Sequence, residues 1–194
     1  MEDKKADIFK CGKELFSSKG FKDTNVSDIT KLAGIGVGTF YNYYSSKEQL
    51  FMEIYLKENE EHKRHLLESM NLQDDPVSMI TKMVARNATE MNSNPILKEW
   101  YNKELFSRLE KSFLEKGGIE NFDEINHSGA MQLIRVWKSE GKMRNDLDDE
   151  LIAAIFKSIL YIDMHKSEIG IQHFPHILFH ITEFIMKGLT DCRK

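Results

Sequence analysis

The sequence predicts an all-α protein, because long segments have helical periodicity and few residues interrupt them. Three prolines occur in 194 residues, and apolar residues seldom alternate with polar ones as they do in a half-buried strand. Gly, Asn, Asp and Pro residues mark the breaks between the helical segments. With 41% hydrophobic and 30% charged residues, the chain can bury one large or two small cores. We expect about nine helices.

The first helical pattern covers residues 5–21. Apolar residues recur at helical spacing in it, at Ile8, Phe9, Leu15 and Phe16. Gly20 suits the C-terminal end of this helix, because glycine readily adopts the left-handed conformation found there. The pattern predicts one amphipathic helix.

Two short helices are predicted next, over residues 26–33 and 37–44. Asn25 is placed as the N-cap of the first, with Asp28 three positions later, and Gly34 ends it. Two short helices joined by a glycine-containing turn predict a helix-turn-helix.

The second short helix has two different faces. Phe40 and Tyr44 share one face and are predicted to lie in the core. The opposite arc carries hydroxyl and amide groups that can bind phosphates and base edges. A long helix then begins near Ser46, with Lys47 in its first turn. A lysine there opposes the helix dipole, and a nearby phosphate would explain it.

The stretch GTFYNYYSSKEQLF, which begins at Gly38, and the helices before it resemble the DNA-binding domain of the TetR family of transcriptional repressors. The resemblance covers the first quarter of the chain, and the rest matches the family in length and helical pattern only. It implies a homodimer whose third helices enter successive major grooves of a palindromic double-stranded DNA operator, roughly 34 to 36 Å apart.

The resemblance also implies which residues contact DNA. Tyr41 and Lys47 match positions that contact phosphates. The full set comprises Thr24, Asn25, Ser27, Gly36, Val37, Gly38, Thr39, Tyr41, Asn42, Tyr43 and Lys47.

Three positions depart from the family's pattern. Gly36 and Val37 stand where many relatives have Ser, Lys, Gln or Glu, so neither offers a side-chain hydrogen bond. Val37 either touches a thymine methyl group or packs in the core. Gly12 stands where relatives commonly have Ala, which is expected to cost on the order of 0.5 to 1 kcal/mol of stability.

Charge adds little attraction for DNA. Residues 1–50 carry eight Lys or Arg against seven Asp or Glu, and the remaining residues carry 19 against 24. We therefore predict modest nonspecific affinity and binding that depends on a well-fitted operator.

The domain boundary is predicted after Lys47. Residues 1–47 would form the DNA-binding domain, and residues 48–194 a helical domain for effector binding and dimerisation. Further helices are expected at residues 46–70, 76–91, 95–116, 121–140, 148–167 and 174–189.

The last two predicted helices are apolar on more than one face and must be covered on two sides. A four-helix bundle across a twofold axis would cover them, as the family resemblance implies. The predicted dimer interface comprises Ile152, Ile155, Phe156, Ile159, Ile177, Ile181, Phe184 and Ile185.

The middle segments hold a predicted effector site for a small apolar or amphipathic molecule that releases the operator. Its residues are Met83, Asn87, Leu97, Trp100, Tyr101, Leu105, Met131 and Arg135. The same residues can equally form a filled core, because large apolar groups at helical spacing often do. Control by a protein partner is then the alternative. A cavity would favour the small molecule, and a solid core beside an exposed apolar patch would favour the partner.

Other functions are not expected. No nucleophile with a base, carboxylate pair or phosphate loop has a recognisable spacing, so we predict no enzyme and no cofactor. Histidines cluster at His165, His173, His176 and His180, but acidic or cysteine companions are missing and no metal is predicted. Cys11 and Cys192 are expected to be reduced thiols. Without a signal sequence or membrane span, we expect a cytoplasmic protein with no membrane partner.

Overall fold

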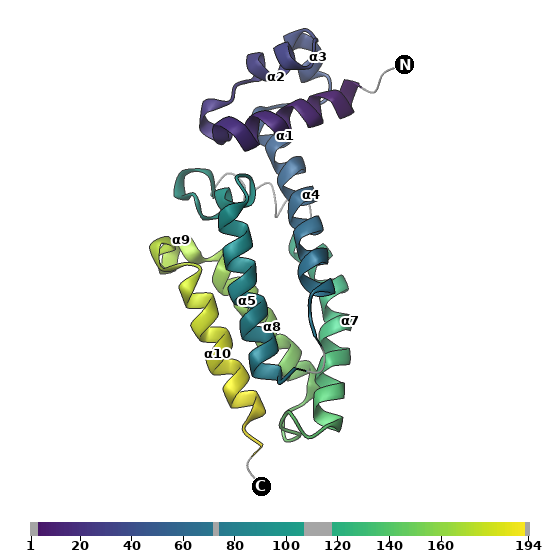
Figure 1. The fold of residues 1–194 in the computed structure, drawn as a ribbon, viewed down its shortest axis with the longest axis vertical. Coiled ribbons are helices and arrows are strands. Elements are labelled where there is room, and N and C mark those ends of the chain that lie inside the picture. Colours follow the sequence, from purple (N-terminus) through teal and green to yellow (C-terminus); the bar gives the residue numbers. More distant parts are fainter. Residues whose placement is uncertain (1–3, 72–73, 107–117, 193–194) are drawn as a thin grey trace. The chain divides into compact units, whose positions relative to one another are not determined.

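The computed structural model describes residues 4–71, 74–106 and 118–192, with side chains at all of these except 118–128 (Figure 1). Its helices are α1 (Lys4–Asp23), α2 (Val26–Leu32), α3 (Val37–Tyr41), α4 (Lys47–Glu68), α5 (Pro76–Ser93), α7 (Gly118–Ser139), α8 (Asp149–Met164), α9 (Lys166–Ile169) and α10 (His176–Thr190). Two 3₁₀ helices, η1 (Leu97–Tyr101) and η2 (Ile171–His173), join them. These described residues contain no strand, and the predicted all-α fold is confirmed.

The chain forms two compact units. The first comprises residues 1–65 and 90–113, and the second comprises residues 66–89 and 114–194. The first unit contains α1, α2, α3, most of α4 and η1. The predicted functional division after Lys47 stays a prediction.

In the first unit, α1 buries an apolar stripe that includes Ile8, Phe16 and Phe21. Gly20 adopts φ 83°, so the helical conformation is interrupted at the predicted residue. The rings of Phe16, Phe21 and Phe51 pack together, with centroids 5.0 Å apart between Phe51 and each of the other two. These aromatic contacts join the end of α1 to α4.

The helix-turn-helix forms as predicted up to its last turn. Asn25 caps α2, and Gly34 adopts φ 66° in the turn before α3. The prediction that the next helix extends to Tyr44 was wrong, because α3 ends at Tyr41. The amide groups of Asn42 and Tyr43 bind the carbonyls three residues before them, which tightens the chain into a turn.

The second unit has its own core between α5, α7, α8 and α10. Asp148 caps α8 by accepting hydrogen bonds from the amides of Glu150 and Leu151. The buried residues of this core are Met79, Met131, Ile134, Trp137, Met143, Ile152, Ala153, Met186 and Leu189.

Several later helices differ from the prediction at their ends, and the helix expected at 121–140 begins earlier, at Gly118. The helix expected at 95–116 was wrong at its start, where residues 97–101 form η1 and Asn102 is extended. Residues 107–116 of that prediction lie outside the described residues. The helix expected at 148–167 ends at Met164, because the chain turns at His165 into the separate helix α9. The last helix begins at His176 instead of Phe174.

Among the described residues, no helix is both long enough and apolar enough to cross a membrane.

Candidate nucleic-acid interface

The outer surface of α3 is exposed at the predicted positions. Val37, Tyr41 and Tyr43 keep 45%, 55% and 41% of their surface accessible. Gly36, Gly38 and Asn42 are also exposed, and Thr39 is half-buried. The core alternative for Val37 was therefore wrong, because the side chain faces outward from the first turn of α3.

The inner side of α3 is anchored by Phe40 and Tyr44, which are 0% and 1% exposed, as predicted. Their ring centroids lie 5.8 Å apart, and Tyr41 meets Phe40 edge-on at 5.4 Å. The Tyr44 hydroxyl donates a hydrogen bond to Glu53 Oε1 on α4 at 3.3 Å. Burial of these two rings leaves the opposite side of α3 open to a ligand.

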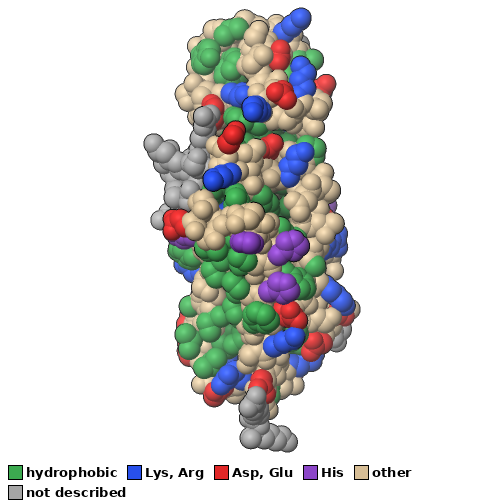
Figure 2. Space-filling model, turned by 90° about the vertical axis from the view of Figure 1, so that its left-hand side faces the viewer, with side chains coloured by type: hydrophobic (Ala, Val, Ile, Leu, Met, Phe, Trp, Pro, Cys, Tyr) green, Lys and Arg blue, Asp and Glu red, His purple; other side chains and the backbone are tan. Residues whose placement is uncertain are grey.

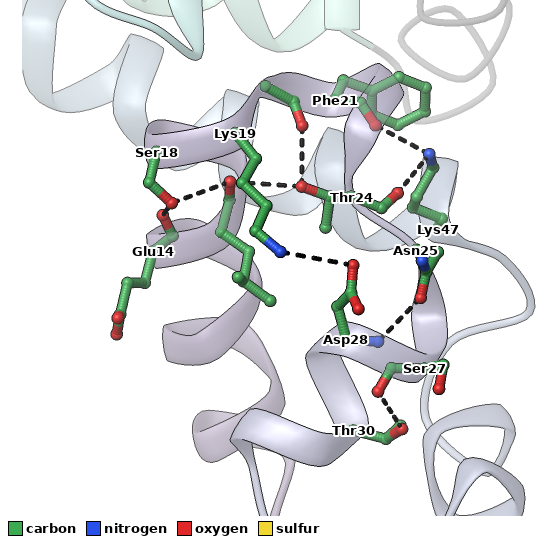
Figure 3. A network of polar contacts seen from close by, with 12 residues as sticks. Glu14, Ser18, Lys19, Phe21, Thr24, Asn25, Ser27, Asp28, Thr30 and Lys47 are labelled. Carbon is green, nitrogen blue, oxygen red and sulfur yellow. Dashed lines mark hydrogen bonds and ion pairs between the residues drawn. The ribbon is translucent and has the colours of Figure 1, made fainter.

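The start of α2 is held by side-chain hydrogen bonds that Figure 3 shows. Asn25 Oδ1 accepts from the amide of Asp28 at 2.8 Å, which satisfies a free amide at the helix start. The Asp28 carboxylate lies 3.7 Å from Lys19 Nζ on α1. Asn25 and Ser27 are exposed and lie where the prediction requires.

Thr24 departs from the prediction because its side chain does not reach the surface. It is 1% exposed, and its hydroxyl donates to the carbonyls of Gly20 at 2.8 Å and Leu15 at 3.3 Å. Gly20 interrupts the helical conformation of α1 next to these contacts. Thr24 therefore completes the end of α1, and its hydroxyl is not presented to DNA.

Lys47 also has partners that the sequence did not predict. Its ammonium donates to the carbonyls of Phe21 at 2.8 Å and Thr24 at 2.7 Å (Figure 3). The same nitrogen lies 4.2 Å from the centroid of the Phe21 ring. Both carbonyls belong to the end of α1 and the link to α2, where the helix dipole favours a cation.

Cys11 lies half-buried in α1. Burial, with smaller effects of Glu14 and Asp7, raises the pKa of its thiol. A raised pKa keeps the thiol protonated and poorly nucleophilic at neutral pH.

The predicted effector residues are divided between the two units. Trp100 in the first unit is buried between aromatic rings, with its centroid 5.5 Å from Tyr55 and 5.0 Å from Phe106. Leu97 and Leu105 are buried in the same unit, and Met131 belongs to the core of the second. Residues Met83, Asn87 and Tyr101 are half-buried.

Arg135 was wrongly predicted to line a pocket. Its side chain is 69% exposed, and its Nε lies 3.6 Å from Asp149 Oδ2. Lys138 Nζ donates to Asp149 Oδ1 at 2.6 Å. The ion pairs hold the end of α7 near the start of α8, and Arg135 takes part in them at the surface.

Among the predicted dimer residues Phe184 is exposed, at 66% of its surface, whereas Phe156 and Ile185 pack against the core of the second unit. The half-buried members are Ile155, Phe156, Ile159, Ile177, Ile181 and Ile185. The assignment of Ile152 to the dimer interface was wrong, because Ile152 is 0% exposed and belongs to the second unit's own core. The prediction missed Leu151 and Tyr161 on α8, which are exposed apolar side chains. Leu151 lies four residues before Ile155 and eight before Ile159, on the same face of α8, which was the available signal for Leu151. Tyr161 does not share this spacing.

A groove of about 580 Å³ lies on the second unit and was not predicted. Its walls come from the end of α8, from α9, η2 and the start of α10. Its lining residues are Ile162, Ile169, Gln172, His173, His176, Ile177, His180 and Ile181. Figure 2 shows histidine side chains grouped beside hydrophobic ones on one face. Within the described residues, no three His, Cys, Asp or Glu side chains are grouped as metal ligands would be.

Comparison with known proteins assigns the helix-turn-helix. The sequence profile described as "Bacterial regulatory proteins, tetR family" matches residues 8–54. The uncharacterized HTH-type transcriptional regulator YfiR of Bacillus subtilis (strain 168) is 24% identical over 180 residues, which cover 86% of this chain and 85% of that protein. A second B. subtilis regulator of the same description, YhgD, is 35% identical over 68 residues, or 35% of this chain and 36% of that protein.

Solved structures share the fold along the whole chain. A crystal structure of RolR in complex with the ligand resorcinol has a TM-score of 0.64 and 16% identity, covering 97% of this chain and 88% of that chain. A putative TetR-family regulator from Mesorhizobium loti MAFF303099 has a TM-score of 0.52 and 19% identity, covering 95% and 94%. The helix-turn-helix over residues 8–54 therefore matches that of the TetR family of bacterial regulatory proteins, and the chain is a DNA-binding transcriptional regulator that shares the fold of solved TetR-family structures.

Proposed function

We propose that this regulator is a repressor that binds a palindromic operator as a homodimer and leaves it when a small apolar or amphipathic molecule binds the helical domain. One observation carries the proposal: α3 and the turn that follows it bury Phe40 and Tyr44 and expose Val37, Tyr41 and Tyr43. Such an arrangement suits a helix that lies in a major groove, with hydroxyls toward phosphates and small groups toward base edges. The proposed place of action is the cytoplasm.

The proposed homodimer pairs α8 and α10 of two copies. Support comes from the apolar side chains that these helices leave accessible: Leu151, Tyr161 and Phe184 are 49%, 42% and 66% exposed. A second copy would remove these surfaces from water, and a twofold axis would match the two halves of a palindrome.

The proposed effector follows from the fold and from a neighbour. RolR, which shares the fold, forms a complex with the ligand resorcinol. Release requires an effector that binds the DNA-free conformation more tightly than the DNA-bound one. A molecule that bound both equally would leave operator affinity unchanged.

One observation favours the alternative of control by a protein partner. Four of the predicted effector residues, Leu97, Trp100, Leu105 and Met131, are buried within the cores of their own units. A filled core beside exposed apolar residues such as Phe184 suits a protein partner better than a small molecule.

The experiment is a selection of bound sequences from a random DNA library, followed by titration of the selected operator. We expect an inverted repeat to be enriched, and a saturating effector to lower the affinity of the dimer for it. An enriched single half-site would contradict the dimeric reading. If no small molecule changes the operator affinity but a protein from the same cell does, the result would support control by a protein partner.

A further inference from the structure

The hydrogen bond between Lys47 and Thr24 closes the helix-turn-helix at its base. Lys47 Nζ donates to the Thr24 carbonyl at 2.7 Å, across 23 positions of sequence. Residues 25–46, which lie between these two, contain all of α2, the turn and α3. Thr24 and Lys47 therefore flank the segment that contains α2 and α3, and the hydrogen bond joins the two ends of this segment.

The bond belongs to a small network at the end of α1 (Figure 3). Lys47 Nζ also donates to the Phe21 carbonyl at 2.8 Å and covers the Phe21 ring at 4.2 Å. The Thr24 hydroxyl, on the same residue that Lys47 holds, donates to Gly20 O at 2.8 Å. One ammonium thus makes two charge-assisted hydrogen bonds and a cation–π contact, each of which fixes its position.

The fixed end of α1 leads directly into α2. Asn25, the N-cap of α2, is the next residue after Thr24. A change in the position of the Thr24 carbonyl therefore moves the first residue of α2. Because α2 packs against α3, such a change reaches the helix that carries Val37 and Tyr41.

We propose that Lys47 is a positioning residue for DNA binding, which sets the placement of α2 and α3 by holding the Thr24 and Phe21 carbonyls, and that phosphate contact is not its main contribution. The inference rests on the proposed binding of an operator by α3. Its chemistry differs from that of a phosphate lysine in one measurable way. A variant that has lost a phosphate contact releases fewer counterions when it binds DNA, so its affinity depends less on salt. A variant in which α3 is misplaced has weaker base contacts but neutralises the same number of phosphates, so its salt dependence is unchanged.

The test is the affinity of Lys47→Met for operator and for scrambled DNA across a salt series. Methionine has an unbranched side chain of similar length to that of lysine but lacks the ammonium group. The matched control is Lys57→Met, since Lys57 is also on α4 and lies over an α1 ring, 5.2 Å from the centroid of Phe9. Circular dichroism and thermal melting establish that each variant is folded at the assay temperature. If Lys47→Met is not folded at that temperature, Lys47→Gln is used instead, because the glutamine amide can still donate a hydrogen bond to one of the two carbonyls.

We expect the Lys47 variant to lose roughly tenfold in operator affinity, about the effect of one lost base contact. The loss should be smaller on scrambled DNA, and the slope of log affinity against log salt should equal that of wild type. Lys57→Met should match wild type in operator affinity, in affinity for scrambled DNA and in the salt slope. An equal loss on both DNAs, with the slope reduced by about 0.9 per lysine, would assign Lys47 to a phosphate and overturn the proposal. A lower melting temperature with unchanged affinity, preference and slope would also overturn it, since Lys47 would then serve the fold alone. Wild-type protein that does not prefer the operator over scrambled DNA would overturn the proposed function and this inference with it.

Discussion

Gly12 of α1 and Leu50 of α4 approach so closely that a side chain at position 12 has no room. A β-carbon placed on Gly12 would lie 2.7 Å from Leu50 Cδ2 and 3.3 Å from Leu50 Cγ. Leu50 is fully buried, so its side chain has little space into which it can move. A side chain at position 12 would therefore force the buried Leu50 side chain to shift.

We predict that Gly12→Ala destabilises the protein. Helix propensity alone would make alanine more stable by about 0.5 to 1 kcal/mol, but overpacking of a core costs about 1 to 3 kcal/mol. We expect a net loss on the order of 1 kcal/mol in the free energy of unfolding, measured with urea. The control is Gly129→Ala in α7, where a β-carbon meets nothing within 4 Å and propensity should dominate. A Gly12→Ala variant more stable than wild type would show that Leu50 rotates away freely.

Val37 is predicted to read a thymine methyl group. We expect Val37→Ala to weaken operator binding by about 1 kcal/mol per half-site, the value of one or two buried methyl groups. The matched control is in the DNA: deoxyuridine at the contacted thymine lacks the methyl. On the deoxyuridine operator, wild type and Val37→Ala should bind equally. A loss of the same size on both operators would assign Val37 to another role.

The hydroxyls of Tyr41 and Tyr43 are predicted to bind phosphates. Tyr41→Phe and Tyr43→Phe should each weaken binding by about 1 kcal/mol on operator and scrambled DNA alike, because phosphate contacts carry no sequence information. Tyr44→Phe is the control: its hydroxyl binds Glu53 within the protein, so stability should fall slightly and DNA affinity should not. A change in sequence preference in Tyr41→Phe would place that hydroxyl on a base edge.

Phe184 is predicted to lie in the dimer interface. Phe184→Glu should convert the dimer into a folded monomer, because a carboxylate on each copy would be buried without a partner. Light scattering after size-exclusion chromatography measures the mass, and circular dichroism reports the fold. The control is Val136→Glu on α7, an exposed apolar residue outside α8 and α10 that is 41% accessible. A Phe184→Glu dimer as tight as wild type would remove this face from the interface.

Stability is predicted to depend on the ionisation of Asp149. The hydrogen bond from Lys138, with the further charge of Arg135, holds the pKa of the Asp149 carboxyl below its ordinary value of 3.8. A pKa lowered by folding stabilises the folded state above the ordinary value and loses that effect as the pH falls through the folded-state pKa. Wild type should therefore exceed Asp149→Asn in unfolding free energy at neutral pH, and the difference should shrink below pH 3.8. A difference that is the same at both pH values would mean that the charge plays no part.

Local sequence patterns predicted the parts of the domain that depend on near neighbours. The cap at Asn25, the break at Gly20 and the buried pair Phe40 and Tyr44 each follow from residues within one or two turns. The end of α3 was missed because Asn42 and Tyr43 adopt a turn that the helical periodicity does not distinguish from another helical turn.

Features that depend on tertiary contacts could not be predicted. Lys47 binds carbonyls 23 and 26 positions earlier in the chain, and no local pattern indicates such partners. Ile152 was assigned to the interface because α8 is apolar on several faces, so periodicity could not tell the core side from the outer side. Arg135 was grouped with apolar residues by its position in sequence, whereas its charge is satisfied at the surface by Asp149.

We propose that the exposed face of α3 recognises a specific DNA sequence. The direct measurement is fluorescence anisotropy of labelled DNA from upstream of the protein's own gene against scrambled DNA, with wild type and Tyr41→Ala. We predict tight binding to the upstream DNA by wild type, weak binding to scrambled DNA, and a marked loss of the tight binding in a folded Tyr41→Ala. Folded Tyr41→Ala that binds the upstream DNA as tightly and selectively as wild type would contradict it.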